Sequence, residues 1–587
     1  MPLATAPVRP SSVTAHQTSF GGRCRAAARA LAGRFGLTAL AVVPIGFLAI
    51  FFAWPVITII GRGLVGEGGL DLTGFAELFS KARTWRLLGR TVGQACLATA
   101  ISAAAAIPLA GLLYRRSFPG RGLARAVLTL PFALPSVVVG LAFRSLLGHS
   151  GPLGFLGLDG SMTAVVLALV FFNVGLMTRV VGVFWAGLDP RPEQAARVLG
   201  AGPWRALATV TLPALTPAIA AGASLVFLFS ATAFAPVLIL GGSTYATVET
   251  EIYLQTAQLL NLRAAAVLSI VQLGVVAAAL AFGARARRRR ERALKLTRTA
   301  QRAGSAGSGN AGTAGRVRWR QDWPAMLVAA AAGVLVVLPL GNLVFRSVHS
   351  ADGFSFHNYL ALGQHAVPGL PYSMLAAAGR SVLVALLAAG IALLLGTALA
   401  VVLTRRPRSP AGRRWQEWLD GFAMLPLGVS AVTVGFGFLI TLKTAPFDLR
   451  TSFWLIPLAQ ALVALPLVVR GVLPALRAVD RRLIQAARVL GAGPWRCFWT
   501  VEAPAAAGGA AVASAYAFAA SIGEFGATTF LARPDTTTLP VAIYKLLGRP
   551  GADNLGMALA GSVLLAAITA AVMALAEWRG GELRVGA

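Results

Sequence analysis

The sequence predicts an all-α integral membrane protein with about twelve transmembrane helices in two parallel six-helix repeats. Three observations predict this fold class. Of the 587 residues, 57% are hydrophobic and only 12% are charged, whereas soluble domains carry roughly a quarter charged residues. Apolar stretches of about 20 residues, long enough to cross a hydrocarbon core of about 30 Å, recur along the whole chain. One string of twelve residues occurs twice, far apart in the sequence.

The chain divides into two sets of six candidate spans on either side of a polar stretch. The first apolar stretch is too long for the hydrophobic region of a signal peptide, so it is expected to stay in the protein as a span. The predicted segments are a cytoplasmic N-terminal tail, a first half, a basic flexible cytoplasmic linker, a second half and a C-terminal tail, over residues 1–36, 37–283, 284–322, 323–578 and 579–587. The candidate spans cover residues 37–60, 91–114, 126–147, 163–188, 215–240 and 263–283, and then 323–345, 381–404, 421–441, 453–476, 505–530 and 556–578.

The positions of the arginines set the expected orientation. Several arginines precede the first span, and the positive-inside rule therefore keeps the N-terminus in the cytoplasm. Because the number of spans is even, both termini are expected there. The first external loop departs from the rule, since it carries the basic residues Lys81, Arg83, Arg86 and Arg90 beside the acidic residues Glu67, Asp71 and Glu77, which are expected to neutralise them in part.

The net charge of +31 has the same topological origin. The arginines lie in the short segments between apolar stretches rather than along one soluble face, so the expected surroundings are a lipid bilayer, and no nucleic-acid partner is expected. The linker opens with the basic run 287–290 and continues through a Gly/Ser/Ala-rich segment at 304–315, a composition typical of flexible, solvated chain. The basic run fits the positive-inside rule, and recognition of an anionic lipid is the alternative.

The internal repeat is the most informative feature of the chain. The string QAARVLGAGPWR occupies residues 194–205 and again residues 485–496, with an offset of 291. Both copies follow an even number of spans, four and ten, and are therefore expected to face the cytoplasm. The two halves are predicted to be parallel repeats, related by an axis along the membrane normal. The same offset aligns Pro213 with Pro504, Phe234 with Phe525 and Tyr253 with Tyr544, and a slightly different offset aligns Gly140 with Gly435.

Each copy of the repeated string lies in a loop long enough for two short helices. In the first copy we expect a helix over residues 192–199, a glycine-proline break at 200–203 and a second helix that ends before Pro213. The first helix combines small and apolar residues with polar ones, as a surface that docks on a soluble partner would. An interfacial amphipathic connector is the alternative. Two nearly identical copies favour docking on a partner with two-fold symmetry.

These loops resemble the EAA motif of binding-protein-dependent ABC importer permeases, in which Glu-Ala-Ala, three residues, a glycine and nine residues precede Ile-x-Leu-Pro. Glutamine replaces the glutamate of the motif in both copies. Glu193 is available to take its place in the first copy, but Ile484 stands at the matching position of the second. The resemblance implies docking sites for two cytoplasmic ABC ATPase subunits, formed by Glu193, Gln194, Ala195, Ala196 and Gly200 in the first half and by Gln485, Ala486, Ala487 and Gly491 in the second.

The same resemblance implies a location and further partners. Permeases of this class lie in the bacterial plasma membrane as multi-pass proteins and work with an extracytoplasmic substrate-binding protein. The fusion of two halves is similar to the ferric-iron and thiamine permeases. Residues 521–528 and 538–544 look like the branch that carries thiamine, iron, sulfate and molybdate. Ferric iron or thiamine is therefore the favoured solute.

The sequence offers no catalytic or metal site. A Walker A loop places a lysine after glycine, but none of the four lysines, Lys81, Lys295, Lys443 and Lys545, follows a glycine. The five histidines form no HExxH pair and no metal-ligand spacing. We therefore expect no catalytic residue, no cofactor and no bound metal in this chain, with ATP bound and hydrolysed by a separate subunit.

Glu524 is the candidate for the substrate path, because a carboxylate within an apolar span is costly unless it serves a purpose. The alternative is that Glu524 packs against a helix end or pairs with a nearby arginine. Two other classes of function remain open. An ion-coupled secondary transporter would place paired acidic residues within the membrane, and a membrane-embedded enzyme would gather acidic or histidine residues at one face.

Overall fold

The computed structural model describes most of the chain, and the N-terminal tail predicted at residues 1–36 lies outside the described part. For residues 286–304, 315–316, 319–321, 350 and 577–585 it describes the backbone alone. The described residues are 40–585 except for 67–68, 243, 305–314, 317–318, 351–352, 365–370, 406–408, 443–448 and 450–451.

The first half contains the helices up to α13. Its first span, Leu40–Leu64, includes a π-helical turn at Ala49–Ala53 and ends with α2 (Trp54–Leu64). The helices that follow are α3 (Thr73–Ser80), α4 (Ala82–Arg115), α5 (Arg121–Ala133), α6 (Ser136–Leu147), α7 (Met162–Ala186), α8 (Arg191–Val198), α9 (Pro203–Ala206), α10 (Leu212–Ala231), α11 (Ala235–Leu240), α12 (Val248–Ala257) and α13 (Leu262–Gly304).

The second half repeats this order. Its helices are α14 (Trp319–Ser347), α15 (His357–Ala361), α16 (Met374–Thr404), α17 (Pro410–Met424), α18 (Ala431–Thr441), α19 (Leu455–Ala478), α20 (Arg481–Val489), α21 (Pro494–Cys497), α22 (Ala503–Ile522), α23 (Gly526–Leu531), α24 (Leu539–Leu547) and α25 (Ala552–Val585). A two-residue hairpin follows the first helix of each half, β1 (Val65–Gly66) with β2 (Gly69–Leu70) and β5 (His349–Ser350) with β6 (Gly353–Phe354).

The membrane-spanning helices agree in number with the sequence prediction. In the described part of the chain, ten helices are long and apolar enough to cross a membrane, and the total is twelve if each of two bent helix pairs counts as one span. The prediction of about twelve transmembrane helices in an all-α fold is therefore confirmed.

Four predicted spans are not single straight helices. Residues 215–240 and 505–530 are interrupted at residues 232–234 and 523–525, and two further spans, residues 126–147 and 421–441, are sharply bent. The first is divided into α5 and α6, which meet at an angle of 103°, and the second turns by 97° between residues 428 and 431. Proline causes the first break: Pro135 has no N–H to donate to the helix, and Leu134 before it is in an extended conformation. In the second, α17 ends at Met424, and Pro426 lies in the short 3-10 turn, Leu425–Gly428, that follows it.

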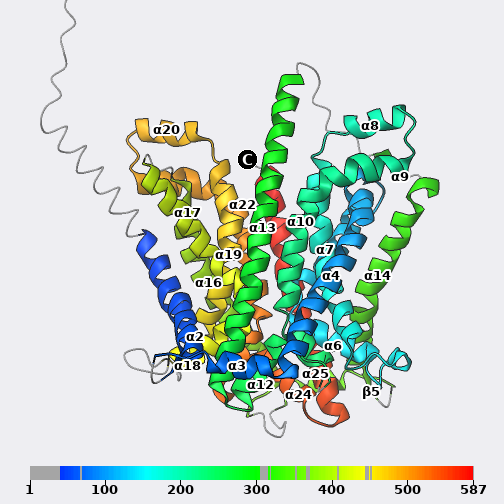
Figure 1. Cartoon of the computed structure of the whole chain (residues 1–587), viewed down its shortest axis with the longest axis vertical. Helices are drawn as coiled ribbons and strands as arrows, with labels where there is room; N and C mark the ends of the chain where they lie inside the picture. The colour runs from blue at the N-terminus through cyan, green and yellow to red at the C-terminus, as the bar shows by residue number, and fades with distance from the viewer. Residues whose placement is uncertain are drawn as a thin grey trace, which may run out of the picture.

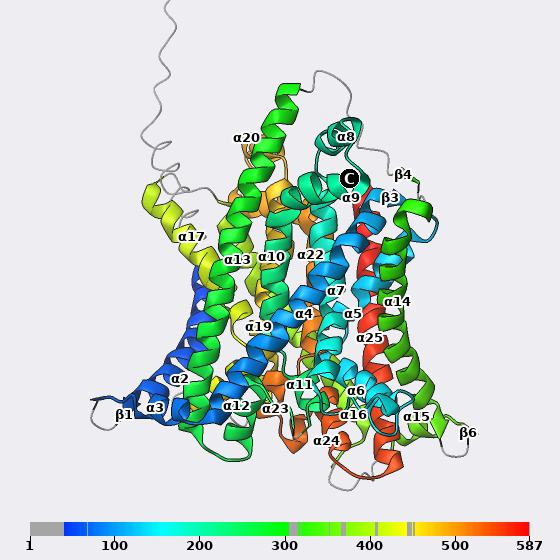
Figure 2. The ribbon, with the colours of Figure 1, turned by 45° about the vertical axis from the view of Figure 1, so that its right-hand side comes forward.

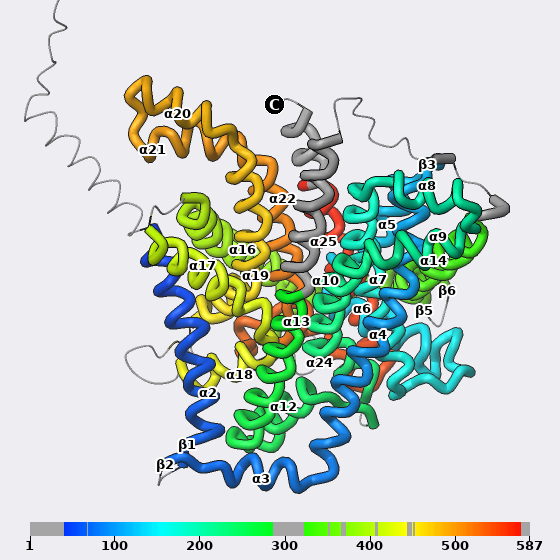
Figure 3. Tube along the Cα trace, turned by 45° about the horizontal axis from the view of Figure 1, so that its top comes forward, coloured from blue at the N-terminus to red at the C-terminus, as the bar shows by residue number. Residues whose placement is uncertain are grey.

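The two halves face the same way. Figure 1 shows α8 and α20 at one end of the molecule, one in each half, and α12 and α24 at the other end. Seen from above, α8 with α9 and α20 with α21 lie on opposite sides of the molecule (Figure 3). This arrangement is that of parallel repeats, and we call the end that carries α8 and α20 the docking-loop face.

The first membrane helix of each half packs against the other half. α2 packs against α18, and α14 packs against α6. A Cβ atom on Gly437 would lie only 2.9 Å from the Cβ of Pro55, which shows how closely α18 and α2 approach. In the second contact, Arg346 donates to the carbonyl of Ser145 at 2.8 Å. The largest group of buried apolar side chains accordingly includes residues from both halves, so the halves share one core.

The predicted linker is more ordered than its composition suggests. α13 does not end near Gly283 but continues as a helix to Gly304, so the basic run 287–290 lies on a helix. Arginine and lysine are good helix formers, and here the membrane span has already nucleated the helix. Beyond it, β4 (Gly315–Arg316) pairs in parallel with β3 (Arg116–Ser117). The Gly/Ser/Ala-rich stretch at 305–314 lies outside the described residues.

Within the described part of the chain, two of the four basic residues of the first external loop pair with an acidic residue, and only one of these pairs is as predicted. Lys81 pairs with Glu77 at 2.7 Å as expected, whereas Arg83 pairs with Glu251 of α12, also at 2.7 Å. Hydrogen bonds from Thr73, together with Arg263, lower the pKa of Asp71 to about 2. The contact between Asp71 and Arg263 is therefore present above about pH 4 and is lost only as the pH falls toward 2. Glu67 lies outside the described residues.

We expect the glycine predicted to be equivalent in the two halves to be required for packing. A Cβ atom on Gly435 would lie 2.8 Å from the Cα of Ala527 and 3.0 Å from its carbonyl oxygen. Gly435→Ala should therefore destabilise the protein by about 1–3 kcal/mol and lower its unfolding temperature in detergent. Gly390→Ala, where a Cβ meets no atom within 4 Å, is the matched control. Equal unfolding temperatures for the two variants would contradict this account of the packing.

Candidate docking loops and central cavity

The repeated string folds the same way in both halves because its glycine ends a helix. Gly200 and Gly491 have φ angles of +87° and +85°, a left-handed conformation that favours glycine. Ala201 N–H donates to the carbonyl of Ala196, and Ala492 N–H donates to that of Ala487, both at 3.0 Å. These are the bonds of a Schellman motif, which closes the end of a helix. The glycine therefore sets the angle between the two short helices of each loop, α8 with α9 and α20 with α21.

The second short helix of each loop differs from the prediction. It does not end before Pro213 but continues through a π-helical turn, Leu207–Thr211, into α10. The second half has the same turn at Phe498–Glu502, before α22. Proline has no N–H and cannot donate the hydrogen bond that continues an α-helix. The wider hydrogen-bonded turn of a π-helix accommodates this missing bond. As a result, each loop is joined rigidly to a membrane helix.

Most of the candidate docking residues lie on the surface. Gln194, Ala195 and Gly200 are exposed, as are Gln485, Ala486 and Gly491, whereas Ala196 and Ala487 are half-buried. The exposed surface extends to apolar residues in the same string. Val198 and Leu199 are each 87% exposed, and Val489 and Leu490 are 87% and 88% exposed. Trp204 and Trp495 are also largely exposed. Exposed apolar residues that recur at equivalent positions mark an interaction site.

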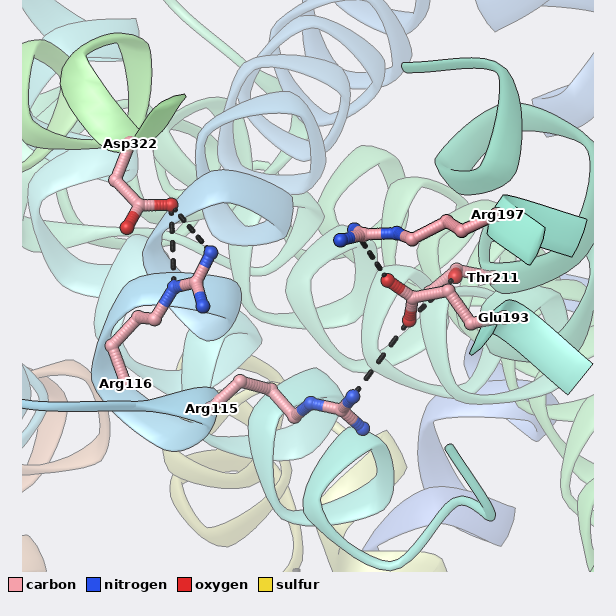
Figure 4. A network of polar contacts seen from close by, with 6 residues as sticks. All are labelled: Arg115, Arg116, Glu193, Arg197, Thr211 and Asp322. Atoms are coloured by element: carbon pink, nitrogen blue, oxygen red, sulfur yellow. Dashed lines mark hydrogen bonds and ion pairs between the residues drawn. The ribbon is translucent and has the colours of Figure 1, made fainter. Parts of the chain in front are cut away.

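The side chain of Glu193 is bound within its own half. Its carboxylate accepts hydrogen bonds from Arg197 at 2.8 Å and from the Thr211 hydroxyl at 3.3 Å, and it lies 3.7 Å from the guanidinium of Arg115 at the end of α4 (Figure 4). These contacts bind α8 to its own half. The side chain is only 20% exposed, so it braces the docking loop from within.

The second half makes an equivalent link with a different carboxylate. Ile484 replaces Glu193, but Glu502 stands where the first half has Thr211. Both oxygens of Glu502 accept hydrogen bonds from Arg405, at 2.8 and 2.9 Å, and its side chain is 6% exposed. Arg405 directly follows α16, as Arg115 ends α4. In both halves an arginine therefore holds the loop, through α8 in the first half and through the π turn before α22 in the second.

A cavity of about 290 Å³ lies between the two halves. Its wall is mostly apolar and rich in phenylalanine, with a few polar groups. The residues that line it include Phe132, Ser136, Phe172, Asn173, Phe229, Thr232, Phe234, Glu524 and Phe525. A pocket of this kind, apolar with a few convergent polar groups, is typical of a small-molecule site.

Glu524 lies in the wall of this cavity, but its carboxylate is turned to its own chain. One oxygen accepts a hydrogen bond from Ala527 N–H at 2.7 Å, and the other accepts from the N–H and the hydroxyl of Thr528. These groups belong to the start of α23, so Glu524 satisfies the free amides of a helix N-terminus within the protein. The structure thus shows Glu524 at a helix end, which was the alternative interpretation, and in the wall of the cavity.

Sequence reasoning missed several residues of these sites. The tryptophans at 204 and 495 lie inside the repeated string and could have been found there. Glu502 could have been noticed as a charge at a position where the other half has threonine. The phenylalanines of the cavity could not have been found, because one apolar residue in a span gives no sign of which neighbour it faces.

Two homologous helical halves, with a cavity between them and a matching exposed loop at the same face of each, define a membrane transport permease. Residues 99–290 and 392–580 match the family model "Binding-protein-dependent transport system inner membrane component", and the chain belongs to this family. It is therefore a multi-pass membrane component of an ABC importer.

Relatives of known function match most of the chain. The thiamine transport system permease protein ThiP of Brucella abortus is 25% identical over 525 residues, which cover 86% of this chain and 89% of that protein. The ThiP of Escherichia coli K12 is 26% identical and covers 79% and 84%. The molybdenum permease ModB of Escherichia coli K12 is 39% identical over 150 residues, which cover 23% and 66%. A bacterial alginate ABC importer of known structure superposes with a TM-score of 0.39 at 20% identity, over 45% of this chain and 98% of that one.

We expect that the carboxylate of the second half can be placed at position 484, as in the first half, instead of at position 502. Glu502→Thr leaves Arg405 without its partner and should destabilise the protein by roughly 1–3 kcal/mol. Adding Ile484→Glu recreates the acid and threonine positions of the first half and should recover part of that loss. Unfolding temperatures in detergent compare the parent, the single variant and the double variant. If the double variant is no more stable than Glu502→Thr, the two positions are not interchangeable.

Proposed function

We propose that this chain is the permease subunit of an ATP-driven importer in which two separate ABC ATPase subunits dock on α8 and α20. The observation that carries the proposal is the pair of loops with the same fold and with exposed Val, Leu and Trp side chains at the same positions of the repeated string, both at one face of the molecule. A partner with two-fold symmetry presents two equivalent surfaces, and these loops match them. The family to which the chain belongs supports this assignment.

The orientation and the remaining partners follow from this docking. If the ATPases lie in the cytoplasm, the docking-loop face is cytoplasmic, and α25 also ends at that face (Figure 1). Both termini are then cytoplasmic, in a bacterial plasma membrane. The opposite face, with α3, α12 and α24, is left for the extracytoplasmic substrate-binding protein. ATP is bound and hydrolysed by the docked subunits, and the permease itself has no cofactor and no catalytic residue.

We propose thiamine as the solute. The two thiamine permeases described above each match most of the chain. The cavity supports the same choice, because rings of phenylalanine bind aromatic and cationic groups through stacking and cation–π contacts, and thiamine carries both. Ferric iron, the other solute expected from the sequence, prefers oxygen and nitrogen ligands. Molybdate is a further candidate through the partial match to ModB.

Charges on the exposed docking residues should prevent association of the ATPase. Val198→Glu together with Val489→Glu places a carboxylate at the end of each docking helix, where the wild-type side chains are exposed and need no repacking. The affinity for the purified cognate ATPase, measured in detergent micelles or nanodiscs, should fall about tenfold or more. Phe155→Glu, at a residue that is 81% exposed and lies in another loop, is the matched control and should leave the affinity unchanged.

Uptake into proteoliposomes then tests the energy source and the solute. With the cognate ATPase and binding protein, labelled thiamine should accumulate only when ATP is supplied, and the Val198→Glu, Val489→Glu variant should lose this uptake. Uptake that persists without ATPase and follows an ion gradient would support the alternative of an ion-coupled transporter. Accumulation of molybdate or ferric iron in place of thiamine would keep the importer assignment and replace its solute.

A further inference from the structure

Two equivalent phenylalanines meet between the halves. Phe234 and Phe525 occupy the same position in the two repeats, and their rings stack on each other with centroids 5.5 Å apart and planes inclined by 20°. Residues that are equivalent in two parallel repeats can touch one another only near the axis that relates the repeats. The stacked pair therefore lies at the axis of the molecule, where a transport path between the halves must pass.

Both rings follow a break in a membrane helix. α10 ends at Ala231 and α11 begins at Ala235, and α22 ends at Ile522 while α23 begins at Gly526. The residues between are not helical. Breaks of this kind are points at which a membrane helix can change direction during transport. The rings are thus placed where a small rotation of the backbone displaces them.

The stacked pair is part of the cavity wall and packs against rings of α12 and α24, the helices at the face opposite the docking loops. Both phenylalanines belong to the cavity wall, yet they are only 6% and 2% exposed. Tyr253 of α12 packs edge-on against Phe234 at 5.5 Å, and Tyr544 of α24 packs edge-on against Phe525 at 5.3 Å. Figure 2 shows α11 and α23 at the same end of the molecule as α12 and α24, beyond the long helices α10 and α22. Four rings in two equivalent pairs therefore connect the cavity wall with the helices of that end.

A single helix connects each ring to a docking loop. α10 starts at the π turn of the first loop and ends three residues before Phe234, and α22 has the same relation to Phe525. Each helix has 20 residues and is thus about 30 Å long. A displacement of α8 or α20 is passed along a rigid element to the ring at its far end.

We propose that the stacked pair Phe234–Phe525 is the outer gate of the transport path. In this structure the rings are together and the gate is closed. Movement of the two docking loops moves α10 and α22 and parts the rings, which opens the cavity to the opposite face. The proposal rests on the transport function proposed above, but the closure itself is a property of the permease without ATP or solute.

Access of a reagent from outside tests the gate. In a chain without its native cysteines, Ser136→Cys in the cavity wall serves as the reporter, and a charged, membrane-impermeant maleimide is added outside intact spheroplasts. With both phenylalanines present, labelling should be slow. With Phe234→Ala and Phe525→Ala, it should be at least about tenfold faster. The control is Phe132→Ala with Phe229→Ala, which removes a ring pair of the same cavity that lies within the first half, and it should not speed labelling.

Two results of the labelling experiment would contradict the gate. Equal labelling of the gate variant and its parent, or equal acceleration in the control, would overturn the gate. If the alanine variant does not fold, Phe234→Cys with Phe525→Cys replaces it. A reducible bis-methanethiosulfonate cross-link between these cysteines should abolish ATP-dependent uptake and reduction should restore it, whereas unchanged uptake would overturn the gate. Labelling requires neither ATP nor solute, so failure of the importer assignment leaves the labelling result intact.

Discussion

The structure depends on one constraint, that a helix can be broken inside a membrane only where the freed backbone groups find partners. Hydrocarbon offers none, so breaks must be buried in protein. Here breaks fall at equivalent places in both halves, after α5 and α10 and after α17 and α22. In the second half, side chains satisfy the helices that restart: Ser430 accepts a hydrogen bond from Thr433 N–H at 3.1 Å, and Glu524 accepts from the amides of Ala527 and Thr528 in α23. Glu524 is thus explained by backbone chemistry, and the cavity beside it forms because broken helices leave a gap between the halves.

The same constraint places the moving parts at the centre. Since the breaks need protein around them, they gather near the axis between the halves, and the residues that follow them face one another there. An aromatic stack adds about 0.5–1.5 kcal/mol beyond the burial of its rings, which is small beside the interfaces that hold the exchanged helices α2 and α14. The halves therefore stay joined through these helices, while the contact between Phe234 and Phe525 is weak enough to separate.

The sequence predicted features that depend on neighbouring residues in the chain, and it did not predict features that depend on tertiary contacts. The repeated string determined the docking loops almost residue by residue, because a glycine with positive φ and a proline at a helix start need no distant contact. Apolar length gave the number of spans. The bends at Pro135 and after Pro426 were not predicted, since hydropathy carries no information on the direction of a helix, and the extension of α13 was not predicted because its polar composition resembles a linker. The role of Glu193 depended on Arg115, which no sequence pattern places beside it.

The two halves have the same backbone at the docking loops but carry the bracing carboxylate at different positions. Glu193 holds α8 itself to α4, whereas Glu502 holds only the π turn below α20. Among the described side chains, α20 has no ion pair with the rest of its half, while α8 has one through Arg115. The residues of the repeated string are identical in the two loops, so they offer equivalent contacts to a symmetric partner. The two loops therefore differ in how they are attached. A displacement of α8 is transmitted to both α4 and α10, whereas a displacement of α20 is transmitted to α22 through the π turn alone. The asymmetry lies in how the halves respond, and recognition remains symmetric.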